Sequence, residues 1–213
     1  FNRIPLAEYH PQEALVKRFS VAFVALLLVA GFASAGQWVP FESGRPERAG
    51  EFRVLSSNSF RTVVELDLAG MYVDEVTEQG RTWHRVELGM AAGGFLPVEG
   101  SPQLPIVAKF LQVPDDRAVK VEVVEVKEVS LTGYNVYPTQ PPLAENETSA
   151  PFVVDGKRYA EDAFYPADNW ASSDPMIMRD LRLVQLVMQP ARYNPVTGEL
   201  RITRKLKVQL TYD

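Results

Sequence analysis

The stretch that decides the fold is LRITRKLKVQLTY, residues 200–212. Apolar and polar side chains alternate along it, and a period of two residues places successive side chains on opposite faces of a β-strand. Only Arg204 interrupts the apolar set, which consists of Leu200, Ile202, Leu206, Val208, Leu210 and Tyr212. The stretch therefore predicts a long strand with one buried face and one wet face.

The residues before this strand predict its hairpin partner. Residues 181–188 are apolar on both faces, which is typical of a central strand. The intervening RYNPVTG, residues 192–198, supplies the Asn, Pro and Gly that favour a turn. The end of the sequence is thus predicted to form an antiparallel hairpin.

The same period recurs earlier in the chain. Residues 81–88 are rich in Trp, Thr and Val and predict a strand. In residues 60–68 we expect one face to carry Arg61, Glu65 and Asp67 and the opposite face to carry Phe60, Thr62, Val64, Leu66 and Leu68.

Residues 117–131 predict a longer strand with an internal irregularity. Val119, Val121 and Val123 share one parity, whereas Val124 and Val126 have the opposite one. Because a slip of one residue inverts every side chain, we predict a β-bulge near Val123 and Val124.

Helical signals are nearly absent. Apart from an N-terminal apolar run, no stretch sustains a period of 3.6 residues, and residues 155–170 are predicted to hold one helical turn at most. We therefore predict an all-β fold, an antiparallel β-sandwich or a partly closed barrel.

The N-terminal region has the pattern of an export signal. Lys17-Arg18 precedes an apolar run over 19–32, and Ala33-Ser34-Ala35 follows. This order predicts a cleavable signal peptide, cut between Ala35 and Gly36. A membrane anchor is the alternative, although the run is short for a transmembrane span.

The chain is accordingly divided into three parts. Residues 1–35 hold the signal peptide and an upstream extension, since residues 1–15 lack secretory character and Val16 is interpreted as the true start. Residues 36–50 form a polar lead-in that is predicted to be flexible, and residues 51–213 form the β-rich domain. The predicted location is secreted or cell-surface, with only transient membrane contact through the signal peptide.

The composition excludes several function classes. The 213 residues include no cysteine, so neither a disulfide nor a thiolate nucleophile is possible. The formal net charge of −5 does not favour nucleic-acid binding. His10 lies in the part predicted to be removed, and His84 is interpreted as an ordinary strand residue. With no phosphate loop or zinc motif, the sequence predicts a non-enzyme without a cofactor.

Three minor patterns carry weak alternatives. Asp115-Asp116 and Asp162 could contact calcium, but lone acidic residues are more often solvated in turns. Asn146-Glu147-Thr148 is formally a glycosylation sequon.

Two irregular stretches separate the predicted strands, over 89–105 and 134–151. The second contains Pro138, Pro141, Pro142 and Pro151. It is long for a connection inside a compact domain, and such loops are usually functional or disordered.

Residues 100–213 resemble the propeptide of gingipain-type cysteine peptidases. The resemblance rests on spaced motifs in the family order: GSPQLP at 100–105, Val113-Pro114, Tyr159 with Asp162 and Phe164-Tyr165-Pro166, Ser173-Asp174-Pro175, Arg179-Asp180-Leu181-Arg182, and Tyr193-Asn194-Pro195-Val196-Thr197. Residues 52–88 fit the preceding strands of the family by pattern alone.

The resemblance implies a pro-region that keeps a downstream cysteine peptidase latent and assists its folding. In some relatives a loop crosses the active-site cleft and a basic residue enters the specificity pocket. Here Leu143 takes that place, which puts an arginine-specific partner in doubt. The expected cleft contacts are Thr139, Gln140, Pro141, Pro142, Leu143, Ala144, Glu145 and Asn146.

Alternatives to this interpretation stay open. Leu143 could fold back onto its own domain. Lys157-Arg158 is a second candidate for the pocket or a processing site, although Asp155-Gly156-Lys157-Arg158 could equally be the tip of a hairpin. The rival function is an extracellular β-sandwich adhesion or carbohydrate-binding module, for which the scattered Trp38, Trp83 and Trp170 give no aromatic platform.

Overall fold

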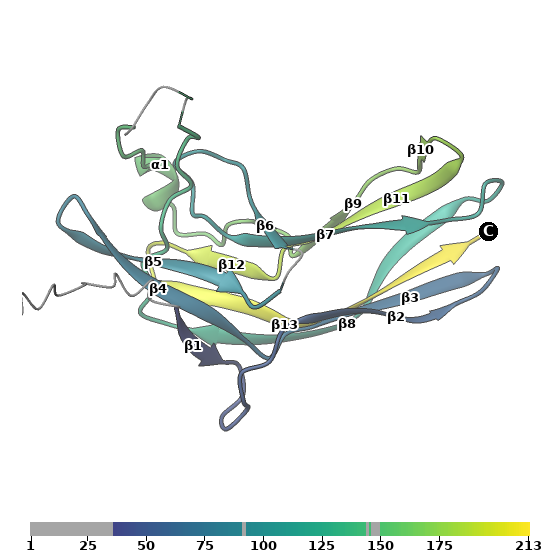
Figure 1. Cartoon of the computed structure of the whole chain (residues 1–213), viewed down its shortest axis with the longest axis horizontal. Coiled ribbons are helices and arrows are strands. Elements are labelled where there is room, and N and C mark those ends of the chain that lie inside the picture. Colours follow the sequence, from purple (N-terminus) through teal and green to yellow (C-terminus); the bar gives the residue numbers. More distant parts are fainter. Residues whose placement is uncertain (1–35, 91–92, 144, 146–149) are drawn as a thin grey trace, which may run out of the picture. The chain divides into compact units, whose positions relative to one another are not determined.

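The computed structural model describes residues 36–213 apart from 91–92, 144 and 146–149 (Figure 1). The predicted signal peptide, its cleavage after Ala35, the start at Val16 and the sequon at 146–148 lie outside the described residues. Within the part that is described, no helix is long and apolar enough to cross a membrane.

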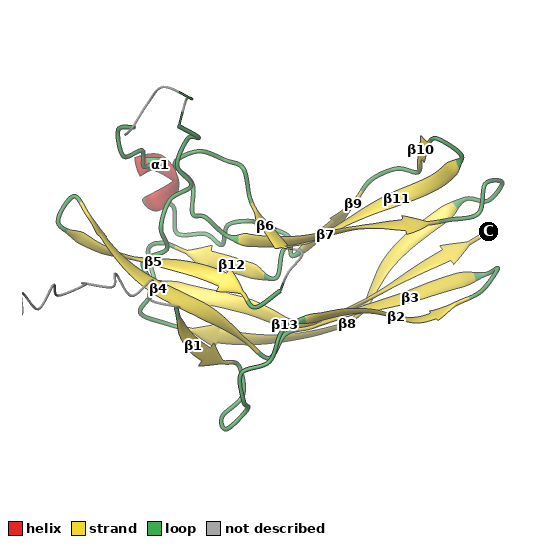
Figure 2. Ribbon diagram, viewed as in Figure 1, coloured by secondary structure: helices red, strands yellow, loops and turns green. Residues whose placement is uncertain are grey.

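The regular secondary structure of the described residues is almost entirely β-strand, arranged in three antiparallel sheets (Figure 2). The first sheet has the order β1-β4-β5, with β1 Gln37–Pro40, β4 Gly70–Glu78 and β5 Arg81–Leu88. The second has the order β10-β11-β7-β6, and β9 also pairs with β11; its strands are β6 Gly93–Phe95, β7 Pro105–Gln112, β9 Trp170–Ser172, β10 Met176–Met178 and β11 Leu181–Met188. The third has the order β12-β13-β3-β2, and β8 also pairs with β13; its strands are β2 Glu51–Ser57, β3 Arg61–Asp67, β8 Val119–Leu131, β12 Ala191–Asn194 and β13 Glu199–Tyr212.

The predicted all-β class is confirmed, in the form of layered antiparallel sheets. The only helix among the described residues is one turn, α1 Gly156–Tyr159, as residues 155–170 predicted. Part of the lead-in that was expected to be flexible is structured, because β1 pairs with β4 and the side chain of Phe41 is buried.

Strand β13 is the centre of the third sheet. One edge pairs with β8 along almost its whole length, and the other pairs first with β12 and then with β3. The C-terminal hairpin is therefore formed, but its predicted partner strand, residues 181–188, is wrong: the short β12 takes that place, and β11 is instead a central strand of the second sheet. The predicted inward set is confirmed, because Leu200, Ile202, Leu206, Val208, Leu210 and Tyr212 are all buried.

Two bulges keep this alternation intact. Arg204 on β13 and Val124 on β8 each have no partner in the pairing of these two strands. After both bulges, the strands return to the register that they had before them. The predicted bulge near Val123 and Val124 is therefore confirmed. Arg204, the residue that broke the inward series, marks the compensating bulge, and its carbonyl accepts a hydrogen bond from the Leu68 amide.

One continuous core joins the sheets. It includes Leu66 and Val64 of β3, Met71 of β4, and Leu186 and Met188 of β11, all nearly inaccessible to solvent. Burial of such side chains at about 25 cal/mol per Å² is the main favourable term in folding. In a chain without disulfides it must hold the domain together.

The predicted faces of residues 60–68 need one correction. Phe60 is 66% exposed, because β3 begins only at Arg61 and Phe60 lies in the preceding turn against the Arg117 guanidinium. Glu65 lies on the predicted face, opposite to Val64 and Leu66, but it is only 5% exposed because neighbouring basic side chains cover it.

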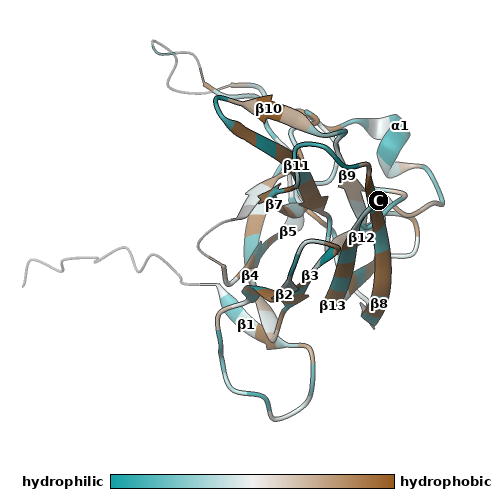
Figure 3. Ribbon diagram, turned by 90° about the vertical axis from the view of Figure 1, so that its right-hand side faces the viewer, coloured by the Kyte–Doolittle hydropathy of each residue, from teal (hydrophilic) through white to brown (hydrophobic). Residues whose placement is uncertain are grey.

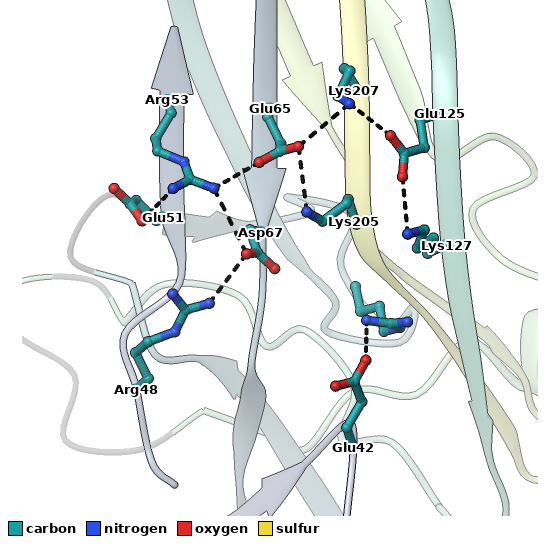
Figure 4. Close-up of polar contacts among 11 residues, drawn as sticks. Glu42, Arg48, Glu51, Arg53, Glu65, Asp67, Glu125, Lys127, Lys205 and Lys207 are labelled. Atoms are coloured by element: carbon teal, nitrogen blue, oxygen red, sulfur yellow. Dashed lines mark hydrogen bonds and ion pairs between the residues drawn. The ribbon is translucent and has the colours of Figure 1, made fainter. Parts of the chain in front are cut away.

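The outward face of the third sheet carries a row of alternating charges (Figure 4). Arg53, Glu65, Lys207 and Glu125 lie in direct register on β2, β3, β13 and β8. Arg53 Nη2 lies 2.7 Å from Glu65 Oε1, and Lys207 Nζ lies 2.7 Å from Glu125 Oε2. Directly opposite pairs of this kind stabilise a sheet by a few tenths of a kcal/mol to about 1 kcal/mol each.

The flanking lysines extend this row, which we call the charge ladder. Lys205 Nζ lies 3.4 Å from Glu65, and Lys127 Nζ lies 3.2 Å from Glu125. Burial alone would raise the pKa of Glu65, but the hydrogen bond from Arg53 and the charge of Lys205 outweigh it and hold that pKa below the ordinary value. Hydrogen bonds from Lys207 and Lys127 likewise lower the pKa of Glu125.

We expect Leu206→Asp to unfold the domain or to lower its free energy of unfolding by about 3 kcal/mol or more, because an unpaired carboxylate would enter the core. Thr211→Asp, on the outward face of the same strand, should cost less than about 0.5 kcal/mol. Lys205 is unsuitable as a control because it contacts Glu65. Urea unfolding of both variants measures this, and equal effects would show that the assigned faces are wrong.

We also expect acid to remove the contribution of the charge ladder to the free energy of unfolding. The folded-state pKa of Glu65 lies below its unfolded value of about 4.3. The stabilisation is therefore complete above that pH and is lost as the pH falls through the folded-state pKa. The difference in unfolding free energy between wild type and Glu65→Gln should shrink below about pH 4.3. Glu87→Gln, at an exposed site without an ion pair among the described residues, is the control. A difference that stays constant with pH would contradict the assignment.

Candidate functional site

The predicted cleft-contact segment, residues 139–146, begins where a clamped stretch of backbone ends. Residues 135–139 are hydrogen-bonded on two sides. On one side, Tyr137 N donates to His84 O at 2.9 Å and His84 N donates to Asn135 O at 2.7 Å. On the other, Thr139 exchanges hydrogen bonds with Gly100 and Ser101, both at 2.8 Å. The segment therefore leaves the domain from a fixed point.

His84 lies in β5, as the sequence predicted. Its Nδ1 accepts a hydrogen bond from the Asn135 amide at 2.9 Å, and its ring packs 5.3 Å from that of Tyr134. The side chain thus helps to hold the clamped stretch in place.

Gln140 closes the base of the segment through two hydrogen bonds to Val153, which we call the Gln140–Val153 buckle. Its side-chain amide donates to Val153 O at 2.9 Å, and its Oε1 accepts from Val153 N, also at 2.9 Å. This pair mimics one rung of a β-ladder and joins the two ends of the loop. The loop between Gln140 and Val153 is therefore pinned at its base.

The tip of the loop is exposed. Leu143 is 54% exposed, Pro142 and Glu145 are also exposed, and Pro141 is half-buried. Ala144 and Asn146 lie outside the described residues. Leu143 lines a hollow of about 260 Å³ together with Glu78, Tyr137, Gln140, Pro141, Ala150 and Phe152. Among the described members of the predicted contact set, Thr139 and Gln140 are anchors, whereas Pro142, Leu143 and Glu145 are exposed.

A cluster of aromatic rings supports the loop from below. Phe152 packs 5.6 Å from Trp83 and 5.5 Å from Tyr137, and Tyr159 packs 5.6 Å from Trp83. The Tyr159 hydroxyl donates to Val136 O at 2.6 Å, and burial raises the pKa of this hydroxyl. Trp83 is buried, so it cannot belong to an exposed sugar-binding platform.

Several motif residues converge on the same clamped stretch. The Tyr193 hydroxyl donates to Tyr134 O at 3.0 Å. Gly100 has a φ of 72°, and a Cβ at this position would come within 2.7 Å of the backbone of Asp155. Only glycine fits between the base of the loop and α1. Sequence reasoning identified these motif residues but could not see that they share one target.

The dibasic pair Lys157-Arg158 lies in α1, which replaces the alternative of a hairpin tip. Asp155 Oδ1 accepts from both backbone amides at 3.0 Å and caps the helical turn. Arg158 pairs with Glu161 at 2.8 Å and lies 4.7 Å above the Tyr165 ring. Lys157 is exposed.

The calcium candidates are separated from each other. The Asp162 side chain accepts a hydrogen bond from Asn194 Nδ2 at 2.8 Å, whereas Asp115 and Asp116 lie in the turn between β7 and β8. The described residues contain no cluster of three or more metal-ligating side chains.

The described residues form a β-domain with an exposed segment at Pro142 and Leu143, held at its base by Gln140 and Val153. Residues 43–213 match the family model Propeptide_C25. The chain belongs to this family, and it is a non-catalytic pro-region of the gingipain type.

Gingipains of Porphyromonas gingivalis are among its relatives. Gingipain R2 is 32% identical over 90% of this chain, and gingipain R1 is 36% identical over 54%. Lys-gingipain is 23% identical over 88% of the chain. The chain spans only 25% of the length of gingipain R2.

Two solved structures share the fold. The complex of P. gingivalis RgpB pro- and mature domains matches with a TM-score of 0.69 and 29% identity, covering 78% of this chain and 87% of that one. A structure on the zymogenic latency of gingipain K matches with a TM-score of 0.69 and 18% identity, covering 84% of this chain and 99% of that one.

We expect Gln140→Ala to loosen the base of the loop. Loss of two hydrogen bonds to Val153, each worth about 1 kcal/mol net, should raise amide hydrogen exchange at Val153 by tenfold or more. Gln112→Ala, at an exposed site on β7, is the control and should leave this exchange unchanged. Equal protection of Val153 in wild type and Gln140→Ala would contradict the pinned loop.

Proposed function

We propose that this chain is the pro-region of an exported cysteine peptidase and holds the peptidase domain of the same precursor latent. The proposal is supported by family membership and by solved relatives described in terms of pro- and mature domains and zymogenic latency. The observation that carries the mechanism is the loop that begins at the Gln140–Val153 buckle and exposes Leu143. Export through the predicted signal peptide gives a secreted or cell-surface location.

In this mechanism the loop occupies the active-site cleft of the peptidase. Pro141 and Pro142 restrict the backbone to extended conformations, which a peptidase cleft accepts. The buckle and the aromatic cluster have already fixed the loop ends when binding begins. Less conformational entropy is then lost on association, and affinity rises accordingly.

The exposed apolar side chain of Leu143 is proposed to enter the specificity pocket. An apolar pocket would suit it, whereas a pocket with an acidic floor would favour a basic side chain. Lys157 and Arg158 are the second candidates, but Arg158 is held by Glu161 and Tyr165. Processing after Arg158 would require α1 to unwind, because peptidases bind extended chains.

A folding role accompanies latency in this proposal. Residues 36–213 contain their own hydrophobic core, so the domain can fold first and offer a surface to the peptidase. An adhesion or carbohydrate-binding role gains no support, since Trp38 packs against Tyr72 and Trp83 is buried.

The experiment is the inhibition constant of residues 36–213 against the separately produced, activated peptidase domain. Leu143→Asp should raise this constant at least tenfold, because burying an unpaired carboxylate in an apolar pocket is costly, and tenfold corresponds to about 1.4 kcal/mol. Val196→Asp is the matched control, because Val196 has the same 54% exposure in a turn remote in sequence. It should change inhibition less than about twofold, a tolerance set by the small effects usual for surface substitutions.

The contrary outcomes separate the parts of the proposal. Unchanged inhibition by Leu143→Asp would remove Leu143 from the pocket, and loss of inhibition in Lys157→Ala or Arg158→Ala would transfer the role to α1. If replacing residues 141–149 by a Gly-Ser linker left inhibition intact in a folded domain, the cleft-blocking mechanism would be wrong.

A further inference from the structure

His84 holds the clamped stretch, residues 135–139, through three of its atoms. Its backbone N donates to Asn135 O at 2.7 Å, and its backbone O accepts from Tyr137 N at 2.9 Å. The side chain adds a third bond, because Nδ1 accepts from the Asn135 amide at 2.9 Å. The latency mechanism makes no use of this imidazole, although His84 is the only histidine among the described residues.

The direction of the side-chain bond fixes the charge of the ring. A backbone N–H only donates, so Nδ1 of His84 must present its lone pair to Asn135. A neutral imidazole has such a lone pair on one nitrogen, whereas both nitrogens of an imidazolium carry a proton and donate. Protonation therefore turns the acceptor into a second donor, and the bond to Asn135 is replaced by repulsion.

A carboxylate lies beside the ring on the neighbouring strand. Glu75 of β4 is directly opposite His84 of β5 in the register, and directly opposite residues share a face of the sheet. The two side chains form no ion pair in this structure, in which the ring is directed at Asn135. Glu75 is exposed, so its carboxylate can turn toward an imidazolium without loss of a buried contact.

The ring has space to move toward this carboxylate, because His84 and Glu75 line a common hollow of about 320 Å³. The other lining residues are Gln37, Val39, Val73, Thr132, Gly133 and Tyr134. Among these described residues Glu75 alone brings a carboxylate or a basic group to the ring. Burial raises the pKa of the Tyr134 hydroxyl, which keeps that group uncharged. Asp74 and Arg85 point to the opposite face of the sheet.

The clamped stretch supports the loop from directly below. Tyr137, whose amide is bonded to His84 O, lines the hollow under Leu143 together with Gln140. Gln140 in turn forms the Gln140–Val153 buckle at the base of the loop. Loosening of the stretch at Asn135 therefore frees the fixed point from which the loop leaves the domain.

We propose that His84 is a proton-sensitive latch of the loop. The neutral ring holds the clamped stretch, and the protonated ring releases Asn135 and turns to Glu75. Histidine ordinarily changes its charge between about pH 5 and 8. Because the released ring takes up a proton more readily than the ring bonded to Asn135, the contribution of this bond is complete above that range and is lost as the pH falls through it. The consequence for latency, weaker inhibition in acid, rests on the proposed function.

The first test uses residues 36–213 alone. It measures the protection of the Asn135 and Tyr137 amides against hydrogen exchange at about pH 7.5 and about pH 5.0, the range in which histidine titrates. After correction for intrinsic exchange rates, protection should fall at least about fivefold in acid, which corresponds to the loss of one hydrogen bond of about 1 kcal/mol. The amides of β13 report whether the whole domain stays folded.

His84→Asn is the matched variant for this test. The side-chain oxygen of asparagine is attached at the same distance from the backbone as Nδ1, accepts a hydrogen bond and does not titrate. Protection in His84→Asn should therefore be the same at both pH values. Glu75→Gln should show a smaller response to acid than wild type, because the imidazolium then lacks its counter-charge.

The contrary results are equally specific. Equal protection of the wild-type amides at both pH values would overturn the inference. An equal fall in His84→Asn would overturn it as well, because the titrating group would then be a different one. An undiminished response in Glu75→Gln would refute the part assigned to Glu75.

The second test separates the latch from the proposed function. The inhibition constants of wild type and His84→Asn against the activated peptidase domain are compared at each pH, so that the pH dependence of the peptidase itself cancels. The ratio of wild type to variant should be at least about twofold larger in acid, within the fivefold limit set by a bond of about 1 kcal/mol. If neither chain inhibits at any pH, the proposed function fails, while the exchange measurement still decides the latch. If both inhibit and the ratio does not change with pH, the link between His84 and latency is refuted.

Discussion

The structure depends on one constraint, the alternation of inward and outward side chains along β13. This strand pairs with neighbours on both edges, so a slip of one residue would carry its apolar series to the solvent and bring its lysines into the core. The bulges at Arg204 and Val124 lie on opposite strands and offset each other. They add local twist without changing which face is buried, and the rest of the core is assembled against that face.

This constraint explains why so much of the fold could be predicted. Alternation is a local property, and it revealed the faces of β13 and most of β3 and even the bulge on β8, where Val123 and Val124 change parity. It placed Phe60 on the wrong face and gave no sign that Glu65 is covered, because both environments depend on neighbours distant in sequence. Phe60 lies beside Arg117, and Glu65 is covered by Arg53 and Lys205. Pairing partners of this kind leave no periodic signal.

The candidate site was predictable to a smaller extent. Proline content identified the segment around Leu143, but nothing in the sequence pairs Gln140 with Val153 or directs the Tyr159 hydroxyl to Val136. These contacts join residues thirteen and twenty-three positions apart, respectively, and their partners become visible only after the sheets have formed. The motifs of the family mark positions of this sort, where a glycine or a tyrosine is required by geometry rather than by chemistry. A resemblance could therefore identify the residues without explaining them.

The two outward faces suggest how a domain without disulfides divides stability from recognition. On the third sheet, β2 and β8 are edge strands whose charged side chains discourage pairing with other chains. The second sheet keeps apolar side chains that are open to solvent, among them Phe110 and Met178, each 50% exposed, and Figure 3 shows much of β10 and β11 in the hydrophobic colour. Exposed apolar surface of this kind costs solubility in isolation and favours association.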